Sequence, residues 1–179
     1  MRYRLFLSMI SCVLTINSFA FADSTLSSHE LKNLAGCWAG TITYLDYSSN
    51  KPFSMPAKLR VADFNKTTTI TGYLEYPEEP KANDADTFFL SADGRLFNQE
   101  PVKLKRSLGK DSLEIVTEIL AIDGNDNKPA LLRHTYLLSK NCYSVKKQVQ
   151  FVGTQTWLLR NEYRFGRVAP CGSGEESKK

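Results

Sequence analysis

Hydrophobic and polar residues alternate with a period of two along most of the chain after residue 36. The clearest example is the segment 156–167, where every second residue forms one face: Trp157, Leu159, Asn161, Tyr163 and Phe165. Segment 55–64 alternates in the same way, with Leu59 between Lys58 and Arg60. Alternation of this kind predicts strands with one buried and one solvated face, which is typical of antiparallel sheets.

The same pattern predicts strands throughout the chain, at 36–47, 55–64, 67–76, 88–90, 95–98, 113–122, 130–139, 143–152 and 156–167. Pro77 and Pro80 indicate a long acidic loop over 77–86, because proline cannot donate a ladder hydrogen bond. The basic run 103–106 reads as the solvated face of a strand or loop. We therefore predict an all-β, up-and-down antiparallel barrel of about 8 to 10 strands, with a β-sandwich as the alternative. Closure is favoured because it removes exposed edges.

Two segments lie before the predicted strands. Residues 1–22 have a basic start, an apolar stretch and an Ala20-Phe21-Ala22 end, so we expect a secretory signal peptide and export to the periplasm or the medium. Polar interruptions argue against a membrane anchor, and lipid attachment at Cys12 is an alternative. Residues 27–34 combine a Ser before Glu30 with Gly36, which predicts one short helix. We expect one domain over 23–170 and a polar tail over 171–179.

Composition narrows the partners. The chain has 23 basic and 19 acidic residues, and removal of residues 1–22 takes away two of the basic ones. A surface this close to charge balance gives no reason to expect nucleic acid or an anionic membrane as partner. After cleavage we expect no membrane-spanning segment. The sequence does not indicate a particular protein partner.

Gly36-Cys37-Trp38, after the predicted helix and at the start of the first strand, resembles the Gly-x-Trp signature of the lipocalins and the wider calycin superfamily. The resemblance implies an up-and-down barrel whose N-terminal helical turn closes one end. It also implies that Trp38 packs under an arginine of the last strand, a role open by position to Arg160, Arg164 or Arg167. The helix that follows a typical lipocalin barrel is absent, which favours a smaller lipocalin-like family.

Barrel closure bears on the cysteines. The first and last strands of such a barrel are antiparallel neighbours, so Cys37 and Cys171 would meet at one end, where Cys142 also lies and competes for Cys171. We favour a Cys37–Cys171 disulfide, worth about 4 to 5 kcal/mol in the chain-entropy model, with Cys142 free. No Cys-x-x-Cys pair supports zinc.

The sequence carries no catalytic signature. It has two histidines, His29 near the N-terminus and His134 in a predicted strand, and a nitrobindin-like barrel would use such a strand histidine to hold haem iron. Asp123 to Asn127 reads as a hairpin turn rather than a calcium loop, because position six is Lys128. We therefore expect no metal, no cofactor and no enzyme.

The function expected is binding of a small apolar molecule in or at the mouth of the barrel, since about eight strands enclose room for one ligand. The alternative is a protein-protein interaction, inhibitor or envelope accessory protein with a filled barrel, and an enzyme comes third. The candidate ligand-binding residues are Tyr44, Leu59, Leu74, His134, Tyr136 and Tyr163.

Overall fold

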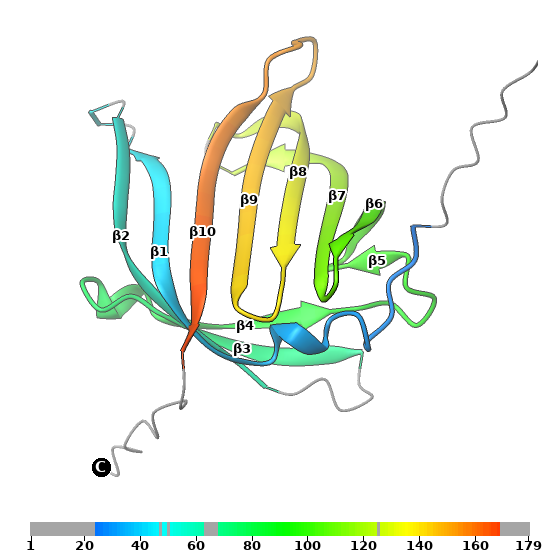
Figure 1. Ribbon diagram of the computed structural model, residues 1–179. Helices are drawn as coiled ribbons and strands as arrows, with labels where there is room; N and C mark the ends of the chain where they lie inside the picture. The colour runs from blue at the N-terminus through cyan, green and yellow to red at the C-terminus, as the bar shows by residue number, and fades with distance from the viewer. Residues whose placement is uncertain (1–23, 47, 50, 63–67, 125, 169–179) are drawn as a thin grey trace, which may run out of the picture.

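The computed structural model describes residues 24–46, 48, 49, 51–62, 68–124 and 126–168. The predicted signal peptide, the polar tail and Cys171 lie outside these residues. Ten strands form one antiparallel sheet that curls into a nearly closed barrel (Figure 1). They are β1 Gly36–Asp46, β2 Lys51–Val61, β3 Thr69–Glu75, β4 Asp84–Phe89, β5 Leu96–Phe97, β6 Glu100–Gly109, β7 Ser112–Asp123, β8 Lys128–Leu138, β9 Cys142–Phe151 and β10 Leu158–Val168.

The strands form an up-and-down meander. Consecutive strands pair with each other except β4 and β5, which stand at the two ends of the strand order. β10 returns to pair with β1, so that Trp38 lies opposite Arg167. The prediction of an all-β antiparallel barrel is therefore confirmed at the level of architecture. The basic run expected as strand or loop is part of the strand β6. Two strands begin earlier than predicted: β2 at Lys51, and β4 at Asp84, inside the stretch expected to be loop.

The ring is weakest between β4 and β5. Among the described residues one isolated bridge spans this junction, from Leu90, just after β4, to Phe97 of β5. Asn98 strengthens this junction. Its Oδ1 accepts the N–H of Phe89 at 3.0 Å, and its own N–H donates to the Phe89 carbonyl at 2.8 Å. Asn98 has a φ of 50°, in the left-handed region that asparagine tolerates better than most residues. The wall therefore has a seam along the free edge of β4.

The short helix predicted over 27–34 is not supported. Among the described residues the only helices are the 3₁₀ turns η1, Lys32–Leu34, and η2, Pro80–Ala82. The predicted cap does form, since the Ser27 N–H donates to Glu30 Oε2 at 2.9 Å, but the hydrogen bonds that follow run from residue i+3 to i. So short a segment does not offset the cost of helix nucleation. Burial of Leu31 and Leu34 in the barrel end orders it instead.

Arg167 covers Trp38 at this end of the barrel. Its guanidinium carbon lies 4.1 Å from the centroid of the indole ring. The same group donates to the carbonyls of Ala35 at 2.8 Å and Asn33 at 2.5 Å, while the indole N–H donates to the carbonyl of Leu34 at 2.9 Å. The arginine thus fastens β10 to the segment that leads into β1.

The other two arginines considered for this role lie elsewhere, which corrects their structural assignment. Arg164 is on the outer face of β10 and pairs with Glu162 at 2.9 Å. Arg160 is buried against Asp123, 2.7 Å away. A β-bulge between Leu159 and Asn161 breaks the alternation, so Arg160 turns inward although the period of two places it outside.

Cys142 is free and exposed, whereas Cys37 is not free. Cys37 lies opposite Val168, near the end of β10. Because Cys171 is outside the described residues, the Cys37–Cys171 disulfide stays a prediction.

Candidate ligand-binding cavity

Inward side chains of four neighbouring strands form a polar row across the barrel. The register pairs Asn161 with Lys147, Lys147 with His134, and His134 with Thr117. Strand alternation points these residues inward together with Val145, Tyr136 and Tyr163 on the adjoining positions. Polar groups buried in a barrel need hydrogen-bond partners. The partners that each residue of the row has within the protein therefore indicate which of its polar atoms are available to a ligand.

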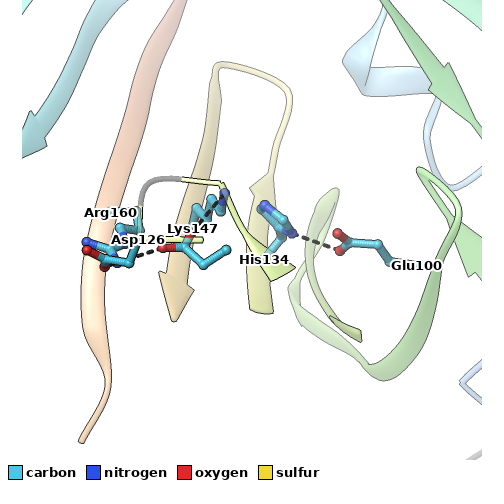
Figure 2. A network of polar contacts seen from close by, with 6 residues as sticks. Glu100, Asp126, His134, Lys147 and Arg160 are labelled. Atoms are coloured by element: carbon cyan, nitrogen blue, oxygen red, sulfur yellow. Dashed lines mark hydrogen bonds and ion pairs between the residues drawn. The ribbon is translucent and has the colours of Figure 1, made fainter. Parts of the chain in front are cut away.

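Glu100, at the start of β6, extends the row to the strand that neighbours β7. Its Oε2 accepts a hydrogen bond from Thr117 Oγ1 at 2.5 Å and lies 2.8 Å from His134 Nδ1. A carboxylate only accepts, so Nδ1 carries the proton, and the other ring nitrogen lies on the side away from Glu100 (Figure 2). Thr117 is fully buried. Glu100 therefore fixes both the orientation and the tautomer of His134.

A cluster of charged side chains lies beside the polar row (Figure 2). Asp123 is fully buried at the end of β7, and its Oδ2 accepts a hydrogen bond from Arg160 at 2.7 Å. Arg160 also pairs with Asp126. Lys147 Nζ lies 3.9 Å from Asp123 Oδ1, which is an ion pair without a hydrogen bond. Two acidic and two basic side chains thus balance one another.

Aromatic rings line the interior below the polar row. Tyr163 stacks on Phe165 with ring centroids 5.7 Å apart, and Phe165 stacks on Tyr143 at 6.0 Å. The Tyr163 hydroxyl is 2.6 Å from that of Tyr76, and the Tyr136 hydroxyl accepts from Asn98 Nδ2 at 3.3 Å.

Burial is the main cause that raises the pKa of all four of these tyrosines above its ordinary value: Tyr76, Tyr136, Tyr143 and Tyr163. They present neutral hydroxyls at neutral pH.

These groups surround a cavity of about 300 Å³ inside the barrel. This volume is at the lower end of the range for small-molecule sites, roughly 300 to 1,000 Å³. Its wall mixes apolar, aromatic and charged side chains: Leu59, Leu74, Asp86, Phe88, Asn98, Glu100, His134, Tyr136, Tyr143, Val145, Lys147, Asn161, Tyr163 and Phe165.

Five of the six residues selected from the sequence stand in this wall: Leu59, Leu74, His134, Tyr136 and Tyr163. The sixth, Tyr44, is not part of the lining and instead packs on Phe53, with ring centroids 5.5 Å apart. Sequence reasoning missed the charged members Asp86, Glu100 and Lys147. For Lys147 the sequence did contain a signal, because it lies two residues from both Val145 and Val149 and therefore shares their inward face of β9.

A larger hollow of about 700 Å³ lies near the β8–β9 turn and includes the exposed Cys142. Its charged groups pair with one another, since Glu162 lies 2.9 Å from Arg164 and 3.9 Å from Lys146. The interior cavity differs in that it is lined by inward side chains, among them the polar row of His134, Lys147 and Asn161. We therefore take the interior cavity as the candidate site.

No family model matches the chain, and no curated protein matches it. A solved structure, described as "Crystal Structure of Rv2717c from M. tuberculosis", is similar with a TM-score of 0.52 and 16% sequence identity, over 83% of this chain and 99% of that chain. At this identity the similarity supports the barrel fold alone. Within the described part of the chain, no helix has the length and apolar character needed to cross a membrane, and no three potential metal ligands gather.

Proposed function

We propose that this protein is an exported binding protein, not an enzyme, that holds one small amphipathic molecule inside its barrel. The observation that carries the proposal is the cavity of about 300 Å³. A barrel filled by its own side chains would have no such space for a ligand. Export rests on the sequence of residues 1–22.

The wall of the cavity defines the kind of ligand. Leu59, Leu74 and Phe165 offer apolar contact on one part of the wall, and His134, Lys147 and Asn161 offer hydrogen bonds on another. A purely apolar molecule would leave these polar groups without partners, which costs free energy when water is displaced. The ligand first expected to be apolar is therefore better described as a small molecule with an apolar body and a polar group.

The first experiment is mass spectrometry of the protein purified from its native host under non-denaturing conditions. A bound compound of small mass supports the proposal. In a second experiment, the purified protein is titrated with indole and followed by NMR, with shifts expected for His134 and Tyr163.

A cavity-filling variant provides the control. Val145→Phe adds a ring to the inner face of β9 and should abolish both the shifts and the co-purified mass. Ser144→Phe adds the same ring to the neighbouring outward position and should leave binding intact. If the wild-type protein carries no compound and indole shifts no interior resonance, the alternative of a protein-protein interaction or accessory role through the outer surface takes its place.

A further inference from the structure

The charges around the cavity do not balance. Asp123 and Asp126 together offset Arg160 and Lys147, as the contacts of 2.7 Å and 3.9 Å to Asp123 indicate. Lys147, the basic side chain in the cavity wall, thus has its countercharge outside the cavity.

The remaining acidic groups of the wall are Glu100 and Asp86. His134 contacts Glu100 at 2.8 Å and is able to balance it when protonated. Asp86 has no ion-pair partner among the described residues, and its Oδ1 accepts the backbone N–H of Thr87 at 2.7 Å. Even with His134 charged, the wall keeps one net negative charge at Asp86.

Asp86 lies at the opening of the cavity. It shares the inward face of β4 with Phe88, two residues further along, and Phe88 is buried. Asp86 lines the cavity and is nevertheless exposed, so solvent reaches the interior at this position. This position is on the free edge of β4, beside the seam between β4 and β5.

The carboxylate of Asp86 acts on the aromatic wall. Burial is the largest cause that raises the pKa of Tyr136 and Tyr163, followed by the charge of Glu100 at Tyr136 and by Tyr76 at Tyr163. The negative charge of Asp86 is a smaller cause that raises both. Its field therefore extends to the rings inside the cavity. The faces of aromatic rings attract cations, and the attraction grows when water is excluded. The carboxylate and the rings favour the same sign of charge in a ligand.

We propose that the ligand is an organic cation, an ammonium group on an aromatic or apolar body, with its charge held between Asp86 and the aromatic rings of the cavity. This inference rests on the proposed function and specifies the ligand class of that same cavity. The ammonium group replaces the missing countercharge of Asp86, and the body of the ligand occupies the space among Leu59, Leu74 and Phe165.

The experiment compares three probes that share a benzyl group and differ in charge: benzyltrimethylammonium, benzyl alcohol and phenylacetate. Each is titrated into the full-length mature protein, and its Kd is measured by NMR. We expect the cation to bind about fivefold more tightly than the alcohol, the upper end for a partly exposed charge pair, and phenylacetate to bind most weakly. The advantage of the cation should shrink as salt concentration rises.

Asp86→Asn should remove the advantage of the cation over benzyl alcohol. Glu75→Gln, on the outer face of β3, makes the same charge change away from the cavity and should leave all three affinities unchanged. Tightest binding of phenylacetate would overturn the inference, since it would assign recognition to Lys147, and the proposed function would stand. Failure of all three probes to bind would overturn both.

Discussion

Arg167 offers a sharp test of how the barrel end is held. Arg167→Ala removes a guanidinium that lies 4.1 Å from the Trp38 ring centroid and donates to carbonyls of the N-terminal segment at 2.8 Å and 2.5 Å. The cation-π contact contributes about 0.5 to 2 kcal/mol. Each hydrogen bond from a charged donor contributes about 1.5 to 3 kcal/mol, without full additivity. We expect the free energy of unfolding to fall by about 4 kcal/mol.

Urea denaturation followed by tryptophan fluorescence measures this loss. With a slope of about 2 kcal/mol per molar, the midpoint should drop by about 2 M. Arg167→Lys keeps the charge but loses the planar fork, so it should recover about half of the loss. Arg164→Ala, on the outer face of the same strand, should cost under about 1 kcal/mol. If Arg167→Ala costs no more than Arg164→Ala, the closure we describe is wrong.

Three further predictions concern the barrel wall and its interior. Asp123→Ala leaves the Arg160 guanidinium buried with one carboxylate fewer and should cost about 3 kcal/mol in urea denaturation, much of it recovered when Arg160→Met is added. Gly40→Ala should destabilise the protein by about 3 kcal/mol or prevent folding, because a Cβ there would overlap the carbonyl oxygen of Arg164; thermal unfolding measures the change. Burial raises the pKa of Tyr136 above its ordinary value of 10.0, so above pH 10 the unfolded chain loses a proton that the folded chain keeps. Stability should therefore fall as pH rises past about 10, by up to about 1.4 kcal/mol per pH unit, and Tyr136→Phe should reduce this slope.

The inward residues of regular strands were accessible from the sequence. Leu59, Tyr136 and Tyr163 stand in the cavity wall, as alternation within their own strands indicates. This information is local, because successive side chains of a strand point to opposite faces whatever the strand pairs with. The up-and-down order of strands likewise follows from short turns between consecutive segments.

The polar chemistry of the cavity depended on contacts between distant segments. Glu100 meets His134 across 34 positions of the chain, and no local pattern states that pairing. Asp86 lies on β4, next to the junction between β4 and β5 that one bridge spans among the described residues. Its place in the cavity wall depends on how the sheet closes, which no local pattern states.

The arginine over Trp38 shows the same division. Three arginines of the last strand fitted the sequence, and the register of β1 with β10 placed Arg167 opposite Trp38. A bulge then turned Arg160 inward toward Asp123, against its own alternation. Alternation within a strand is set by the geometry of its backbone, so the sequence alone determined which faces of the regular strands are buried. Register, bulges and closure depend on hydrogen bonds between strands, and only the tertiary structure decided which charges meet inside the barrel.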